Sequence, residues 1–103
     1  MNPTEETREV EALVRGIAKA LVDIPEAVSL EAMSADRATV FRLRVHPTEA
    51  GKVIGKQGRN ARAVRILLSA VSAKLRHQYS LEIVEGERRH EEALAANPAA
   101  LPA

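Results

Sequence analysis

Apolar residues recur at helical spacing near the start of the chain. The apolar positions of residues 9–22 are Val10, Leu13, Val14, Ile17, Ala18 and Leu21. Steps of three and four residues are typical of an amphipathic helix that lays one face on a core. Pro25 follows this segment, and a proline ends or follows a helix. The pattern predicts a first helix over residues 9–22.

Residues 59–75 show the same periodicity with a wider apolar surface. The regular positions are Ala61, Val64, Leu68, Val71 and Leu75. Further apolar side chains widen the stripe at Ala63, Ile66, Leu67, Ala70 and Ala73. One helix face packed on one sheet does not need so wide a stripe. We therefore expect a second long helix that also contacts either helix 9–22, which we favour, or a partner chain.

Three shorter segments alternate between apolar and polar residues, which is typical of half-buried strands. In residues 38–45, the apolar Phe41, Leu43 and Val45 alternate with Arg42 and Arg44. Weaker alternation marks residues 27–33, and a final strand is predicted over residues 78–84. Each strand then has one apolar face toward the helices, and Arg42 and Arg44 lie on the far face of the sheet.

A short helix is expected over residues 48–54, because Pro47 suits a first helical turn and Gly55 a helix end. The predicted order is α-β-β-α-α-β. Three strands whose apolar faces meet three helices form a two-layer α+β domain.

The net charge of +1 hides a segregation along the chain. Residues 50–81 hold seven Lys and Arg and no Asp or Glu, whereas the rest holds eight basic residues and all 14 acidic ones. Only Phe41 and Tyr79 are aromatic, so base stacking on aromatic platforms is excluded. A cationic segment of this kind is either a solvated helix face or a surface for a polyanion.

Several classes of protein are excluded or disfavoured by composition. The chain has no Cys, so disulfides, thiol nucleophiles and Cys-ligated metals are ruled out. His46, His77 and His90 are scattered without metal-ligand spacing. The chain lacks an apolar run of ~18–20 residues, and its polar N-terminus does not resemble a signal peptide. We expect a cytoplasmic protein with no catalytic site, metal or cofactor and no membrane association.

The most informative motif is Gly55-Lys56-Gln57-Gly58, which joins the two helices inside the cationic segment. Glycines permit a positive φ and the close approach of a ligand. The second helix begins at once, so its first N–H groups are free to bind an anion. The spacing fits neither the Walker motif nor the dinucleotide fingerprint. The motif suits a phosphate of a nucleic-acid backbone, although a Gly-x-x-Gly motif alone is more often a tight helix–helix turn.

This motif, in the segment Val53-Ile54-Gly55-Lys56-Gln57-Gly58 followed by Arg62, resembles the KH RNA-binding domain. The predicted order is that of the type II arrangement. The short length and the Leu21-Val22-Asp23-Ile24-Pro25 segment resemble the small bacterial single-KH proteins of the KhpA (YlqC) family. The resemblance covers about residues 10–85, so we expect a KH domain over residues 8–85 after a flexible N-terminus (1–7). The C-terminal extension (86–103) has no counterpart in the resemblance, and we expect it to be partly disordered because it has too few apolar residues to bury.

The resemblance implies binding without catalysis. In KH domains, the Gly-x-x-Gly loop grips the backbone of about four single-stranded nucleotides. By position, Gly55, Lys56, Gln57 and Gly58 form this loop. The implied residues beside the phosphates are Lys52, Arg59 and Arg62. The implied apolar floor for the bases, which could equally be ordinary core, is Val53, Ile54, Ala61 and Val64.

The family also implies single-stranded RNA as the ligand, self-association and pairing with a larger KhpB (Jag/EloR)-type protein. It further implies a post-transcriptional regulator or RNA chaperone with a role in cell elongation and division. Two alternatives stay open: a dimerisation module whose RNA contact is secondary, and a binder of single-stranded DNA.

Overall fold

The computed structural model describes residues 3–85 and confirms the predicted two-layer α+β fold and its order. The helices and strands are α1 (Pro3–Leu21), β1 (Ser29–Ala35), β2 (Ala38–Arg44), α2 (Ala50–Ile54), α3 (Arg59–Leu75) and β3 (Gln78–Val84). Single turns of 3-10 helix occupy Pro25–Ala27, Pro47–Glu49 and Lys56–Gly58. The last of these turns connects α2 to α3.

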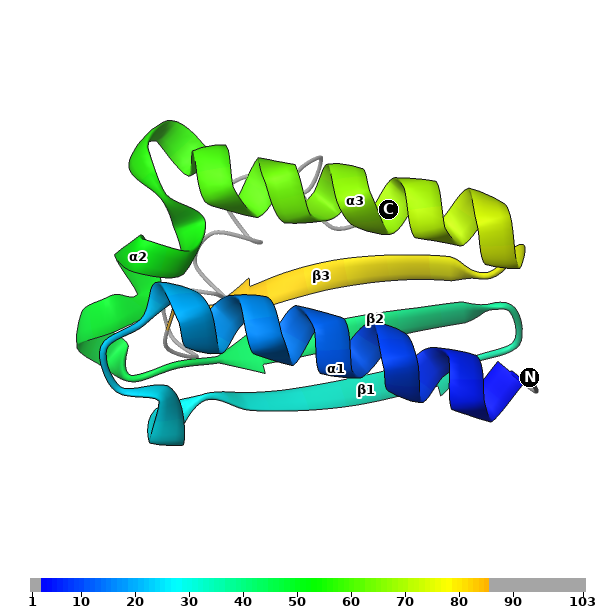
Figure 1. Ribbon diagram of the computed structural model, residues 1–103, viewed down its shortest axis with the longest axis horizontal. Coiled ribbons are helices and arrows are strands. Elements are labelled where there is room, and N and C mark those ends of the chain that lie inside the picture. The colour runs from blue at the N-terminus through cyan, green and yellow to red at the C-terminus, as the bar shows by residue number, and fades with distance from the viewer. Residues whose placement is uncertain (1–2, 86–103) are drawn as a thin grey trace, which may run out of the picture.

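The three strands form one sheet in the order β1-β2-β3. Strands β1 and β2 are antiparallel and are joined by the two-residue turn Asp36-Arg37. Strand β3 pairs parallel with β2, because α2 and α3 carry the chain back to the same end of the sheet. This crossover makes β3 an edge strand that runs beside α3 (Figure 1).

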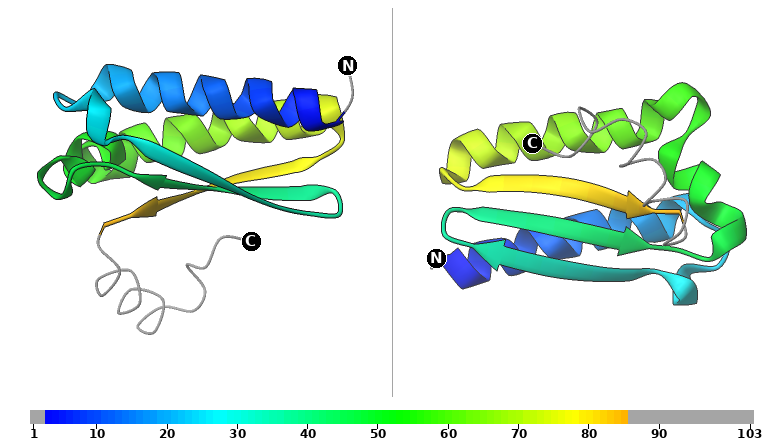
Figure 2. Two further views of the ribbon diagram at one scale, coloured as in Figure 1. Left: turned by 90° about the horizontal axis from the view of Figure 1, so that it is seen from below. Right: turned by 180° about the vertical axis from the view of Figure 1, so that it is seen from behind.

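The long helices cover one face of the sheet, as Figure 2 shows from below and from behind. The core fills the space between the layers. Its most buried large side chains are Phe41 and Leu43 of β2 and Leu81 of β3. The helices contribute Val10, Val14, Ala18, Val53, Val64 and Leu68.

Both aromatic residues belong to this core and are unavailable for stacking on bases. The Phe41 and Tyr79 rings stack with centroids 5.7 Å apart and planes 3° apart. The Tyr79 hydroxyl is also within hydrogen-bond distance, 3.1 Å, of the Thr7 hydroxyl on α1. On the far face of the sheet, Arg42 Nε lies 3.7 Å from Glu82 Oε2, since the two residues are partners in the β2–β3 register.

Several boundaries differ from the prediction. Helix α1 begins at Pro3 and not at residue 9, so residues 3–7 of the predicted flexible N-terminus are helical. Pro3, Glu5 and Glu6 suit a first helical turn, but they carry no apolar periodicity that would reveal one. Strand β1 lies two residues later than expected. The predicted extension, residues 86–103, lies outside the described residues.

The wide apolar stripe of α3 is only partly buried. Ala61, Val64 and Leu68 are buried. Ile66 and Leu67 are 62% and 52% exposed, so the favoured packing of the stripe against the first helix does not cover these two side chains. Leu13 of α1 is also exposed, although the periodicity placed it on the apolar face.

Candidate nucleic-acid interface

The glycine loop, Gly55–Gly58, is a tight turn built from backbone conformations that most side chains disfavour. Gly55 ends α2 with φ +81° and ψ 166°, and Gly58 precedes α3 with φ +73°. Gln57 between them also has a positive φ, 59°. The Gly58 N–H donates to the Gly55 carbonyl at 3.0 Å, which closes the turn. Both glycines therefore have backbone conformations that glycine adopts more readily than other residues.

Asn60 holds the loop in place. Its side-chain Nδ2 donates to the Lys52 carbonyl on α2 at 2.9 Å, so the first turn of α3 is tied to the preceding helix. This contact requires Asn60 to sit against Gly55. A Cβ at Gly55 would lie 2.7 Å from the Asn60 backbone nitrogen, whereas one at Gly58 would meet nothing within 4 Å. Gly55 therefore makes room for Asn60, whereas Gly58 only supplies the left-handed backbone conformation that precedes α3.

The predicted phosphate-flanking cations do not behave alike. Lys56, Arg59 and Arg62 are exposed and form no ion pair within residues 3–85. They stand on the loop and on the first turns of α3, where free helix N–H groups add positive potential. These three cations remain available for phosphates.

Lys52 has a different place. Its ammonium pairs with Asp23 and, at 3.3 Å, with Glu49, and both partners raise the pKa of Lys52, with Asp23 as the larger cause. Two carboxylates already compensate this cation, so its predicted position beside the phosphates is not favoured by the structure.

Glu49 is the anchor beneath this ion pair. Its buried carboxylate accepts hydrogen bonds from the Asp23 N–H at 2.5 Å and the Ile24 N–H at 2.8 Å. The bond from Asp23 is the main reason that the pKa of Glu49 is lowered. Because Glu49 directly precedes α2, the carboxylate fixes the α1–β1 connection against the helix that leads into the glycine loop.

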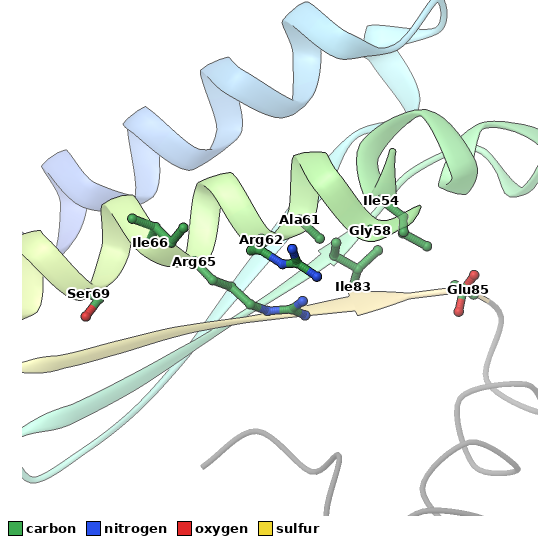
Figure 3. Close-up of a pocket in the computed structure, with 9 residues that line it drawn as sticks. All are labelled: Ile54, Gly58, Ala61, Arg62, Arg65, Ile66, Ser69, Ile83 and Glu85. Carbon is green, nitrogen blue, oxygen red and sulfur yellow. The ribbon is translucent and has the colours of Figure 1, made fainter. Parts of the chain in front are cut away.

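A groove of about 640 Å³ opens beside the loop, between α3 and the edge strand β3 (Figure 3). Its lining residues are Ile54, Gly58, Ala61, Arg62, Arg65, Ile66, Ser69, Ile83 and Glu85. In Figure 3, the Arg62 and Arg65 side chains extend from α3 toward β3, and Glu85 lies at the loop end. The groove therefore combines an apolar floor with guanidinium groups at its rim.

The structure divides the predicted floor residues into two pairs. Ile54 and Ala61 line the groove. Val53 and Val64 do not line the groove and belong to the hydrophobic core. Apolar identity cannot distinguish the two pairs in the sequence, because the core and the groove lie on adjacent faces of the same helices.

Sequence reasoning missed the half of the groove that β3 supplies. Ile83 and Glu85 come beside α3 only through the parallel crossover. Arg65 was also missed as a site residue. Its Nε and Nη2 donate to the Leu81 carbonyl at 3.4 and 3.2 Å, so the guanidinium lies at the open strand edge. The spacing of Arg65 three residues after Arg62 was the only available signal.

Residues 3–85 contain no group of three His, Asp or Glu side chains that could hold a metal ion. Within the same range, every helix is too short or too polar to cross a membrane.

Comparisons with known proteins point to one family. The family model described as "KhpA/KhpB, KH domain" matches residues 11–83, from α1 to β3. A protein of Caldanaerobacter subterraneus named "RNA-binding protein KhpA" is 44% identical over 72 residues, which are 70% of this chain and 96% of the relative. A protein of Listeria monocytogenes with the same name is 42% identical over 76 residues, 74% of this chain and all of the relative. No solved structure is significantly similar.

Proposed function

The chain belongs to the KhpA/KhpB family of KH domains, and on this premise we propose that it binds single-stranded RNA in the groove between α3 and β3. One observation carries the proposal: unpaired cations on a glycine loop stand at the end of an open groove with an apolar floor. The relatives' name, "RNA-binding protein KhpA", supports RNA as the ligand.

We expect the phosphate and the base of a nucleotide to contact different parts of the groove. Phosphates approach the glycine loop, where Lys56 and Arg59 and the helix N–H groups supply positive charge without a side chain in the way. Bases then lie against Ile54, Ala61 and Ile83. No bond is made or broken, and the expectation that the chain is not an enzyme is confirmed by its family.

The affinity of this contact depends on salt. Each phosphate contact on a single strand lowers log K by about 0.7 per unit of log salt concentration. Three cations, Lys56, Arg59 and Arg62, therefore give a slope of about −2. A single domain with so few contacts is a modest binder, which suits a protein that acts on many RNAs or in a larger assembly.

A double variant in the loop tests the proposal. Lys56→Asp with Gln57→Asp places two negative charges where the phosphates would lie, and we expect RNA binding to be lost. Both side chains are exposed, so circular dichroism and the melting temperature should show an intact fold. Lys19→Asp with Ala20→Asp is a matched control, because it makes the same change in charge at exposed positions of α1.

Binding is measured by fluorescence anisotropy with RNA oligonucleotides and with DNA of the same sequences. A folded loop variant that still binds RNA like the control would refute the proposed role of the loop. Equal affinities for RNA and DNA would favour the alternative ligand, single-stranded DNA, because phosphates and bases are common to both.

A second candidate function is self-association, and exposed apolar side chains favour it. Ile66 and Leu67 of α3 and Leu13 of α1 are large, apolar and 49–62% exposed. Exposed apolar side chains mark an interface where they form a contiguous patch, and Ile66 and Leu67 are neighbours in the sequence. Leu67 does not line the groove, so Leu67→Asp should weaken self-association without changing RNA affinity, with Leu67→Ala as the milder control. Analytical ultracentrifugation would exclude this function if the unmodified protein stayed monomeric at high concentration.

The finer roles implied by the family remain proposals. They are post-transcriptional regulation or RNA chaperoning, with a KhpB-type partner and an influence on cell elongation. The family description, which joins KhpA and KhpB domains, supports the choice of partner. Crosslinking and sequencing of bound RNA would separate the two roles, because a regulator predicts a defined motif and a chaperone predicts a broad set of RNAs.

A further inference from the structure

The groove does not end at Arg65. A second compartment of about 180 Å³ continues along the edge of β3 and is lined by Arg65, Leu68 and Ser69 of α3 and by β3 from Gln78 to Leu81. Arg65 and Ser69 line both compartments. We call the hydrogen-bonded contact from Arg65 to the Leu81 carbonyl the first tether. It divides one continuous groove into two compartments and does not mark the end of the groove.

A second side-chain hydrogen bond joins α3 to β3 further from the glycine loop, and we call it the second tether. The Tyr79 N–H donates to the Ser72 hydroxyl oxygen at 2.9 Å, and the Ser72 hydroxyl donates in turn to the Leu68 carbonyl at 2.7 Å. Tyr79 and Leu81 are two residues apart, or about 6.6 Å along a strand. This spacing along the strand is similar to the width of one planar heterocycle.

The strand edge supplies unused hydrogen-bonding groups to this space. In a parallel strand, the N–H and C=O of one residue face the same side. The Tyr79 N–H and the Leu81 carbonyl both bond to α3, so the Tyr79 carbonyl and the Leu81 N–H face that side too. Neither of the latter two groups has a partner within residues 3–85. One donor and one acceptor side by side match the edge of a nucleobase.

Arg65 adds a third contribution. Its guanidinium is held by the Leu81 carbonyl through two of its nitrogens. A fixed guanidinium plane can stack on a base. The compartment therefore combines a cationic wall, an apolar floor of Leu68, Tyr79 and Leu81, and a polar strand edge.

We propose that the compartment between the Arg65–Leu81 and Ser72–Tyr79 tethers binds one further base of the same RNA strand, beyond the nucleotides held beside the glycine loop. This rests on the proposed RNA binding in the first compartment. Continuity of the groove supports one strand as the occupant, since the strand needs only to pass Arg65. The open edge of β3 is then used for recognition in place of pairing with another chain.

The test uses the full chain and RNA probes that differ by one base. These are the four- and five-nucleotide oligomers of adenosine, and five-nucleotide oligomers in which the first or the last residue is abasic. We expect the complete five-nucleotide oligomer to bind at least about fivefold more tightly than one of the abasic forms, from the worth of one stacked base. This difference is larger than the gain that a longer oligomer has only because it can bind the same site in two alignments.

A protein variant locates the effect. Ser69 extends toward β3 in Figure 3 and is exposed. Because Ser69 lines both compartments, the affinity of each variant for the four-nucleotide oligomer is the reference. Relative to it, Ser69→Phe should bind the complete and abasic five-nucleotide oligomers equally, whereas Ser69→Ala should keep the difference. The proposal is overturned if the unmodified protein binds the four-nucleotide oligomer but does not distinguish the complete oligomer from either abasic form. If it binds none of the oligomers, the proposed RNA binding itself fails.

Discussion

The two glycines of the loop should differ in how much an added methyl group costs. At Gly58, φ is +73° and ψ is 15°, and a Cβ would meet nothing within 4 Å. Gly58→Ala then loses only the left-handed preference, about 1 kcal/mol. At Gly55, φ is +81° and ψ is 166°, a conformation essentially restricted to glycine, which alone costs about 1–3 kcal/mol. The overlap of the Cβ with the Asn60 backbone at 2.7 Å adds to this cost.

Gly55→Ala should therefore lower the free energy of unfolding by about 3 kcal/mol or more, against about 1 for Gly58→Ala. For a domain of this size, the difference corresponds to roughly 10 °C in melting temperature. Urea denaturation and thermal melting of the two variants measure it side by side. Equal losses, or a larger loss at Gly58, would refute the assigned loop conformation and the role of Asn60 as the residue that holds it.

Two further predictions concern charged groups near the groove. The pKa of Glu49 is lowered in the folded state, so its contribution to stability is present above its unfolded pKa of about 4.5 and is lost as the pH falls through the folded value. The urea midpoint of the unmodified protein should thus fall on acidification below about pH 4.5. Glu49→Gln should be less stable at pH 7, and its urea midpoint should depend less on pH. If the midpoints of the two proteins fell in parallel with pH, this role of Glu49 would be contradicted. Glu85 is the one carboxylate lining the groove, and it repels phosphates. Glu85→Gln should therefore raise RNA affinity in anisotropy titrations at low salt, and the gain should shrink as salt is added. An unchanged affinity at low salt would mean that the RNA does not pass near Glu85.

The sequence was most informative where local signals agree with tertiary contacts. Helix α3 and strand β3 have the predicted bounds, because Gly58 marks the helix start and the apolar periods of 3.6 and 2 are clear on either side of the turn at residue 76. The first turn of α1 was missed, since its residues are polar and its link to the sheet, from Thr7 to Tyr79, spans 72 residues.

The site was predicted on the helices but not on the strand. The glycine loop and its cations are contiguous in the sequence, and a motif can identify them. Ile83 and Arg65 become site residues only because β3 crosses over to lie beside α3. Val53 and Ile54 illustrate the same limit, because a rotation of one residue along α2 separates core from groove. The ion pair of Lys52 with Asp23 could not be predicted either, because the two residues lie 29 positions apart in the sequence.

The central claim is that RNA lies in the groove between α3 and β3, gripped by the glycine loop. NMR titration of the isotope-labelled full chain with a single-stranded RNA oligonucleotide tests it residue by residue. The account predicts that the amide shifts concentrate on the glycine loop, the first turns of α3 and the end of β3 at Ile83. Shifts concentrated instead on the far face of the sheet, around Arg42 and Glu82, would contradict it.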